Sequence, residues 1–283
     1  MQNLNKCITP STVAKDLKTY LNQNKEIIIL QIDKSKNLGI VDIEDYIFKL
    51  NQVFSPDKFE KLSKNPLQSD ILKFHKVIYK LKPYLSISDN YLIQPTESIK
   101  KGYGILKIKK PGMPLRPIVS SIFSITSGAE QYLLKILKPL VEKCKFSLSS
   151  TKVFKEKFMK ITQNFTNFYE IFNIDATSLY TSINVPRVID HIVSEIYTDP
   201  DSYFNDNNLG SFPPENTFKD FIIGILLEFN TFETLQGYYR QKEGLSMGGK
   251  LSSAISNIFL NMLECEIIQG YLDQNIFFFM VVT

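Results

Sequence analysis

The sequence predicts an α+β fold, in which short strands carry polar residues at their ends and helices pack behind them. The chain has 283 residues and is 43% hydrophobic, which is enough to bury a substantial core. Segments with helical spacing alternate with short apolar strands, and Gly is scarce at 12 residues. We therefore expect a folded protein of one large domain or two interleaved subdomains.

The N-terminal half contains the first group of predicted elements. Residues 26–50 have the pattern of a strand, a turn, a second short strand and the beginning of a helix. Residues 69–81 place apolar residues at helical spacing, with Ser69 and Asp70 as candidate caps. Residues 128–143 show the same spacing and predict another helix.

The C-terminal half alternates in type. An apolar strand is predicted over residues 168–175. An amphipathic helix follows over residues 186–197, with Asn184 as its cap. Residues 219–230 fit a helix or a strand equally well, and residues 251–266 predict a helix after a Gly-rich loop.

Charge and cysteine content restrict the setting of the protein. There are 33 basic and 29 acidic residues, a net charge of +4, which permits a polyanionic partner without requiring one. Cys7, Cys144 and Cys265 lie far apart without metal-ligand spacing, which favours reduced thiols. The N-terminus lacks the apolar core of a signal peptide, and the apolar run 221–227 is too short to span a bilayer. We expect a soluble, intracellular protein with no membrane partner.

Residues 107–117 (KIKKPGMPLRP) form a basic segment with a turn signal. Pro111 and Gly112 suit the central positions of a type II turn. A tight hairpin closed there would place Lys107 opposite Arg116. Like charges across a ladder destabilise it, so the pattern favours a bound polyanion such as a triphosphate. A solvated basic surface, or simple attraction to a nucleic-acid backbone, explains the spacing equally well.

Two further segments have possible chemistry. Asp175 stands at the end of the predicted strand, where a carboxylate can hold a divalent metal, although a turn or capping aspartate is the commoner case. The loop 244–250 (GLSMGGK) precedes a helix, which by itself is a generic signal for a phosphate site.

Four stretches of the chain resemble the reverse transcriptase of Penelope-like retroelements. YGILKIKKPGMPLRPIVSS is similar to the family pattern YGLPKIHKPGNPLRPIVS, and the upstream DKSKNLGIVDIEDY is similar to DKGNGVVVLDKDDY. FNIDATSLYTSINVP resembles the motif DVxSLFTNIP, and EGLSMGGKLSSAISNIFLNMLE resembles GxAMGSPLSPxLANIFMxxxE. The resemblance covers roughly residues 26 to 266, in the family's order.

The resemblance implies a right-hand polymerase, with fingers and part of the palm present. It implies an N-terminal extension and fingers helices over 1–95. The fingers hairpin and its following helix would cover 96–145, and the palm 146–283. The expected activity is RNA-directed DNA polymerisation, with an RNA template, a DNA primer and dNTPs as partners. A nuclear location is expected by family.

The resemblance also implies roles for individual residues. Asp175 would be catalytic, and its carboxylate with the backbone carbonyl of Ala176 would hold Mg²⁺ in a two-metal site. The aromatic ring of Tyr180 would exclude a ribose 2′-hydroxyl. The remaining nucleotide-binding residues would be Lys107, Lys110, Arg116 and Gly248, and the template–primer loop would contain Gly244, Met247, Gly249 and Lys250.

Two departures from the family pattern modify these expectations. The usual Ser-Pro of the loop is Gly249-Lys250, which we expect to loosen the loop and add a charge near the template. The second palm motif, YVDD, is expected at 280–283, where the sequence is MVVT, so Val282 and Thr283 stand in place of the metal-binding aspartates. The motif, thumb and GIY-YIG nuclease are therefore expected to be missing.

Three explanations for this departure stay open. The first, which we favour, is a decayed copy of a mobile element. The second is a truncated or misread gene, and the third is a domesticated domain. We expect little polymerase activity, and the alternative function is a catalytically inert RNA- or DNA-binding domain derived from a reverse transcriptase.

Overall fold

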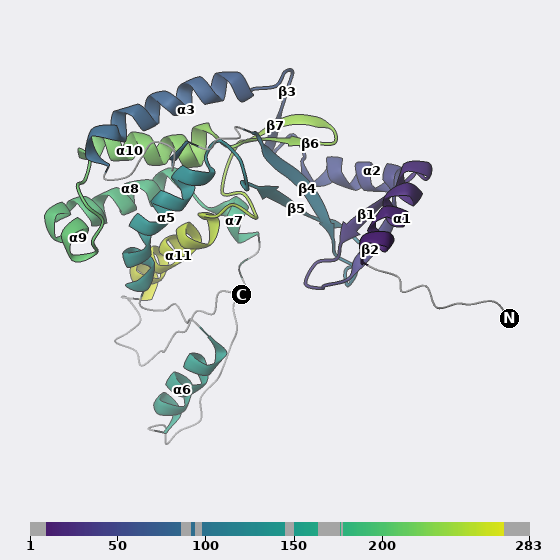
Figure 1. The fold of residues 1–283 in the computed structure, drawn as a ribbon. Coiled ribbons are helices and arrows are strands. Elements are labelled where there is room, and N and C mark those ends of the chain that lie inside the picture. Colours follow the sequence, from purple (N-terminus) through teal and green to yellow (C-terminus); the bar gives the residue numbers. More distant parts are fainter. Residues whose placement is uncertain are drawn as a thin grey trace.

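A mixed five-stranded sheet lies at the centre of the molecule (Figure 1). The computed structural model describes residues 10–85, 92–93, 98–144, 150–163, 176 and 178–268. Only β6 and β4 pair in parallel, and the other neighbours in this sheet are antiparallel. The strands in spatial order are β3 (Phe59–Leu62), β7 (Gly237–Gln241), β6 (Thr231–Thr234), β4 (Lys100–Leu106) and β5 (Leu115–Ser120). The predicted α+β class is confirmed.

An N-terminal strand pair with its helix lies beside the end of this sheet. Helix α1 (Pro10–Gln23) precedes the antiparallel strands β1 (Ile27–Gln31) and β2 (Leu38–Asp42). Helix α2 (Ile43–Val53) begins directly after β2, because the Asp42 carboxylate accepts hydrogen bonds from the first-turn N–H groups. The pair of strands and the helix predicted within residues 26–50 are confirmed.

Helices gather on the side of the sheet away from β1 and β2 (Figure 1). The longer ones are α3 (Leu67–Leu81), α5 (Ser127–Glu142), α8 (Val185–Tyr197), α10 (Glu215–Ile223) and α11 (Ser252–Ile268). Shorter elements are α7 (Leu179–Ser182), α9 (Pro200–Asp206), a 3-10 turn (Lys82–Tyr84) and a π-helical turn (Gly224–Glu228). A further helix, α6, covers Thr151–Thr162. The four other predicted helices are confirmed to within two residues, and the undecided segment 219–230 is helical with a π-helical end.

Two apolar cores hold these layers together. The larger core lies among the helices and includes Phe74, Leu133, Ile192, Phe221 and Ile255, all buried. The smaller one packs α2 against the sheet, with buried residues Tyr46, Leu50, Phe54, Val119 and Phe232. The sheet therefore joins the helical side to the N-terminal side, and β4 and β5 lie at this junction.

The two predicted helix caps have different outcomes. Asn184 accepts a hydrogen bond from the Arg187 N–H and caps α8, as predicted. The caps predicted for α3 are wrong, because this helix begins two residues earlier, at Leu67. Asp70 is 4% exposed and accepts a hydrogen bond from the Thr231 hydroxyl at 2.7 Å, so its carboxylate joins α3 to β6 instead.

Two other expectations concern segments along the chain. The strand predicted over residues 168–175 lies outside the described residues. Among the helices of the described part, none is long and apolar enough to cross a membrane.

Candidate functional site

The basic hairpin is formed by β4 and β5 and the connecting residues 107–114. The Met113 N–H donates to the Lys110 carbonyl at 3.0 Å, and Gly112 has a φ of 72°, as a type II turn around Pro111-Gly112 requires. A second turn precedes it, in which the Lys110 N–H donates to the Lys107 carbonyl at 3.1 Å. The predicted turn is therefore confirmed, but it caps a longer connection.

This additional turn changes the strand register. The ladder ends with Leu106 opposite Leu115, so Arg116 lies opposite Ile105. The predicted pairing of Lys107 with Arg116 is wrong, because the residues used in the extra turn shift the ladder by two positions. Repulsion between Lys107 and Arg116 therefore gives no argument for a bound polyanion. The charge around Arg116 depends on other neighbours.

Asp33 is the neighbour that the sequence did not suggest. Its carboxylate lies 3.0 Å from Nη2 of Arg116, with side-chain exposures of 13% for Asp33 and 33% for Arg116. Asp33 follows β1, and its N–H donates to the Leu106 carbonyl at the end of β4. The first strand pair thus places a carboxylate against the arginine of the hairpin.

The turn that follows Asp175 is described from Ser178 onward, together with Ala176. Ser178 has a φ of 56°, and its carbonyl accepts hydrogen bonds from the Thr181 N–H and hydroxyl and from the Ser182 hydroxyl. Tyr180 is half-buried and packs against the helical core. Ala176 is exposed, and Asp175 itself lies outside the described residues.

One end of the glycine loop 244–250 is held against this turn. The Leu245 N–H donates to the Tyr180 carbonyl at 2.7 Å. A Cβ atom at Gly244 would lie 2.6 Å from both the Tyr180 carbonyl oxygen and the Thr181 Cα, and Gly244 has a φ of 68°. Only glycine fits where two backbones approach this closely.

The other end of the loop is held against the hairpin. The Val119 N–H in β5 donates to the Met247 carbonyl at 2.7 Å. A Cβ atom at Gly248 would lie 2.8 Å from Cγ2 of Ile118, and Gly248 has a φ of 97°. The loop therefore contacts the hairpin at one end and the turn after Asp175 at the other, so three separately predicted segments lie together.

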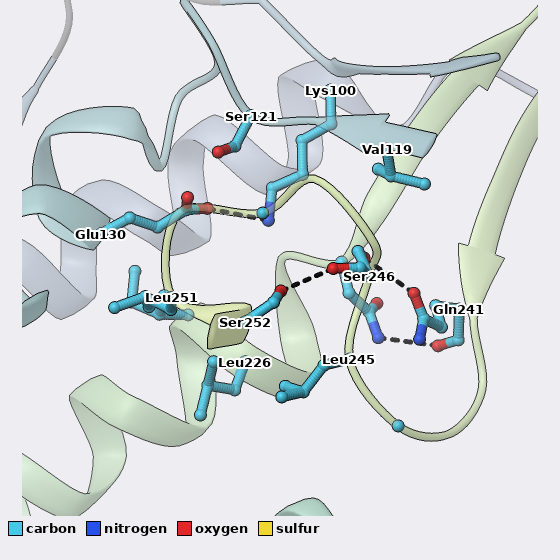
Figure 2. Close-up of a pocket in the computed structure, with 14 residues that line it drawn as sticks. Lys100, Val119, Ser121, Glu130, Leu226, Gln241, Leu245, Ser246, Leu251 and Ser252 are labelled. Atoms are coloured by element: carbon cyan, nitrogen blue, oxygen red, sulfur yellow. Dashed lines mark hydrogen bonds and ion pairs between the residues drawn. The ribbon is translucent and has the colours of Figure 1, made fainter. Parts of the chain in front are cut away.

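The loop is braced internally and at its exit to α11. The Ser252 hydroxyl donates to the Ser246 carbonyl, and the Ser246 hydroxyl donates to Oε1 of Gln241 (Figure 2). Lys250 donates to both the carbonyl and the hydroxyl of Ser127, in the first turn of α5. The lysine that stands in place of the family's proline thus ties the loop to α5, and the expected loosening stays a prediction.

Beneath the loop lies a buried ion pair that sequence reasoning missed. Nζ of Lys100 in β4 is 3.1 Å from Oε1 of Glu130 in α5, and the side chains are 11% and 4% exposed. Both residues line a cavity of about 30 Å³ together with Ser246 and Ser252 of the loop region (Figure 2). No spacing signal links a strand lysine to a helix glutamate, so only the tertiary structure reveals the pair.

The pKa of Glu130 follows from this arrangement. Burial by itself raises the pKa of the carboxyl, but the Lys100 ammonium and the hydrogen bond from Thr126 outweigh burial and hold the pKa below its ordinary value. Glu130 is therefore a buried carboxylate that keeps its charge, and it connects β4 to α5 under the loop.

The expected metal ligands can be placed only in part. Within the part of the chain that the structure describes, no three His, Cys, Asp or Glu side chains come close enough to hold a metal ion. Asp175 and the positions 280–283 lie outside the described residues. The roles predicted for the nucleotide-binding and loop residues stay predictions, and so does the Tyr180 gate.

Comparison with known proteins gives a match in structure and none in sequence. No protein-family model matches the chain, and no curated protein matches it in sequence. A solved structure of telomerase from Candida albicans, in complex with a TWJ fragment of telomeric RNA, has a similar fold, with a TM-score of 0.54 at 12% sequence identity. The alignment covers 92% of this chain and 44% of that chain. At this identity the likeness shows a shared fold, over less than half of the telomerase chain.

Proposed function

We propose that this chain is the fingers and palm of a reverse transcriptase of the Penelope-like type. It would bind an RNA template paired with a DNA primer, and it would bind a dNTP at the hairpin. The similar fold of telomerase, a reverse transcriptase-related enzyme, supports this at the level of the fold. The motifs quoted from the sequence support it at the level of residues.

The contact pattern of the glycine loop is the observation that carries the proposal. The loop accepts a hydrogen bond from β5 at Met247 and donates one to Tyr180 at Leu245. A site that handles a nucleotide needs cationic groups for the triphosphate, a surface for the base pair and a metal-binding carboxylate within one nucleotide's length. The hairpin, the loop and the turn after Asp175 are candidates for these three parts.

Each residue then has a stated role in the proposal. Arg116 would contact the triphosphate with its planar guanidinium, and Lys107 and Lys110 would add point charges. Tyr180 would face the sugar 2′ position and reject ribonucleotides. The backbone at Gly248 and its loop neighbours would lie close to the templating base pair, because glycine has no Cβ atom.

The donor set that the sequence offers suits Mg²⁺. The Asp175 carboxylate and the Ala176 carbonyl are hard oxygen ligands, which this cation prefers. When bound, Mg²⁺ would favour ionisation of the primer 3′-hydroxyl and neutralise charge on the departing pyrophosphate. The part of the protein would be to hold the triphosphate at Arg116 and to keep the primer end beside Asp175.

The experiment is a pair of assays on the 283-residue chain. In the first, fluorescence anisotropy measures binding of a labelled RNA–DNA hybrid at several salt concentrations. We expect binding that weakens steeply with salt, because phosphate contacts release counterions. An affinity for the hybrid no greater than for a neutral polymer would contradict the proposal.

In the second assay, primer extension is followed with dNTPs and Mg²⁺. We expect no extension above background, because Val282 and Thr283 stand where the family has aspartates. Robust extension that Asp175→Ala abolishes would contradict this expectation and assign polymerase activity to the chain. Salt-dependent binding without extension would assign it an inert binding function.

A further inference from the structure

The ion pair between Asp33 and Arg116 joins two segments that lie far apart in the sequence. Oδ2 of Asp33 is 3.0 Å from Nη2 of Arg116. Among the described residues, Asp33 is the one ionic partner of this arginine, and Nε of Arg116 is buried without a hydrogen-bond partner. Asp33 therefore holds one terminal nitrogen of the guanidinium, and the side chain as a whole is still one-third exposed, so the terminal N–H groups have further hydrogen-bonding capacity.

The backbone around Asp33 is hydrogen-bonded to the hairpin that carries Arg116. The Asp33 N–H donates to the Leu106 carbonyl at 2.9 Å, and Ile32 forms a parallel bridge with Leu106. The next residues close a tight turn, in which the Ser35 N–H donates to the Ile32 carbonyl. The carboxylate is thus attached to the end of β4, the strand that pairs with the strand of Arg116.

The three lysines in the connection between β4 and β5 differ from Arg116 in this respect. Lys109 and Lys110 are exposed, Lys107 is half-buried, and none of the three forms an ion pair within the described residues. An unheld long side chain loses rotamer freedom when it binds a ligand, whereas a side chain held in advance loses less. Because the backbone of Asp33 is attached to β4, its carboxylate favours one orientation of the Arg116 guanidinium before a ligand binds.

We propose that Asp33 is a positioning residue, which orients the guanidinium of Arg116 for the triphosphate of an incoming nucleotide. This inference rests on the proposed function, because it takes Arg116 as a nucleotide ligand. Asp33 acts through Arg116 and makes no contact of its own with the nucleotide. Arg116 neutralises the charge of Asp33, and the exposed Lys109 and Lys110 of the same connection add positive charge, so the surface still favours an anion.

The test measures binding of fluorescent dTTP to the full chain with an RNA–DNA hybrid and Mg²⁺. The variants are Asp33→Ala, Asp33→Asn, Arg116→Ala and the double variant Asp33→Ala with Arg116→Ala. The matched control is Asp220→Asn. Asp220 on α10 forms an exposed ion pair with Lys80 on α3, so this variant removes an acidic partner from a surface pair. Thermal melting checks that each variant folds.

The expected results follow from loss of prearrangement. Asp33→Ala weakens dTTP binding about fivefold to tenfold, which corresponds to freeing one long side chain. Asp33→Asn weakens it less, about threefold, because the amide oxygen at the same position can accept a hydrogen bond from the guanidinium. In the Arg116→Ala background Asp33→Ala has no further effect, and affinity for the hybrid itself changes less than about twofold.

Several outcomes overturn the inference, and they are distinguishable from failure of the proposed function. Tighter dTTP binding by Asp33→Asn would show that the carboxylate competes with the triphosphate. If both Asp33 variants bind dTTP as the wild type does, while Arg116→Ala binds it weakly, only the positioning role of Asp33 is ruled out. Absence of dTTP binding by the wild-type chain, or an Arg116→Ala variant that binds normally, would remove the proposed nucleotide site and the inference with it. If Asp33→Ala does not fold, the isosteric Asp33→Asn decides.

Discussion

Gly112 at the tip of the basic hairpin and Gly244 in the glycine loop have nearly the same backbone conformation and opposite surroundings. Their φ angles are 72° and 68°. A Cβ atom at Gly112 would meet nothing within 4 Å, whereas at Gly244 it would lie 2.6 Å from the backbone of Tyr180 and Thr181. The hairpin tip is open to solvent, and the loop is enclosed by its neighbours.

The lysines of the two regions show the same difference. Lys110 at the hairpin tip is exposed, whereas Lys250 of the loop donates to Ser127 and Lys100 beneath the loop pairs with Glu130. Lys100 and Lys250 are therefore used to hold the fold, whereas Lys109 and Lys110 in the connection between β4 and β5 are exposed to a ligand. The comparison indicates a structural loop and a ligand-facing hairpin.

The largest expected effect concerns the support beneath the loop. Glu130→Ala leaves the Lys100 ammonium buried without its partner, which costs about 3–5 kcal/mol of unfolding free energy. Urea unfolding followed by circular dichroism measures the change. Glu142→Ala is the control, since it breaks an exposed pair with Lys138 in the same helix and is expected to change stability by less than about 0.5 kcal/mol. Equal losses in both variants would show that the buried pair is not structural.

The next effect compares the two glycines directly. Gly244→Ala combines backbone strain at positive φ with a clash against backbone atoms, and we expect a loss of about 2–4 kcal/mol. Gly112→Ala has the strain without the clash, and we expect about 1 kcal/mol. Urea unfolding of both variants gives the difference. A Gly112→Ala variant as unstable as Gly244→Ala would contradict the distinction between the two regions.

The charge of the hairpin tip is expected to affect binding and not stability. Lys107→Glu combined with Lys110→Glu should weaken binding of an RNA–DNA hybrid and dTTP about tenfold or more, through loss of phosphate attraction. Unfolding free energy should change by less than about 0.5 kcal/mol, since both side chains lack an ion pair within the described residues. Lys135→Glu combined with Lys138→Glu on the exposed side of α5 changes the net charge by the same amount and is the control. A loss of affinity as large in the control would assign the effect to overall charge.

The smallest effect concerns Glu264, a half-buried carboxyl on α11, the helix that follows the loop. Burial raises the pKa of Glu264 to about 7, and its Oε2 has no hydrogen-bond partner in the described part of the chain. In the unfolded chain a Glu titrates near pH 4.3, so between about pH 4 and pH 7 the folded state binds more protons. The stability contributed by this group is complete below that range and lost as pH rises through it.

Glu264→Gln should therefore remove part of the fall in stability between pH 5 and pH 8. We expect a difference of about 1 kcal/mol, reduced by solvent because the group is only half-buried. Urea unfolding of both proteins at the two pH values measures it. Parallel pH profiles would contradict a raised pKa. Glu130 provides the contrast, since its cationic partner lowers the pKa of an even more deeply buried carboxyl.

The elements that the sequence predicted correctly depend on local chemistry. The apolar spacing of residues 128–143 and 251–266 defines a helix face, and Pro111-Gly112 defines a turn. The hairpin, the glycine loop and the turn after Asp175 also lie together, as the family resemblance implied, although the patterns of the last two were generic by themselves. Local pattern was enough for these features.

The features that were missed or wrong depend on tertiary contacts. The hairpin register depends on an extra turn over residues 107–110, which contains no Gly or Pro that would predict a turn. Asp70 was read as a cap, but a threonine on a distant strand uses its carboxylate. The pairs Asp33–Arg116 and Lys100–Glu130 join residues from different elements, and no spacing rule connects them.

The most direct test of the central claim is where a nucleotide attaches. An azido-dUTP, photo-crosslinked to the full chain with an RNA–DNA hybrid and mapped by mass spectrometry, reports the residues around the bound nucleotide. The account predicts crosslinked peptides from the hairpin 107–116, the turn at 176–180 and the loop 244–250, competed by unlabelled dTTP. Competable crosslinks confined to other parts of the chain, such as α1 or α9, would contradict it.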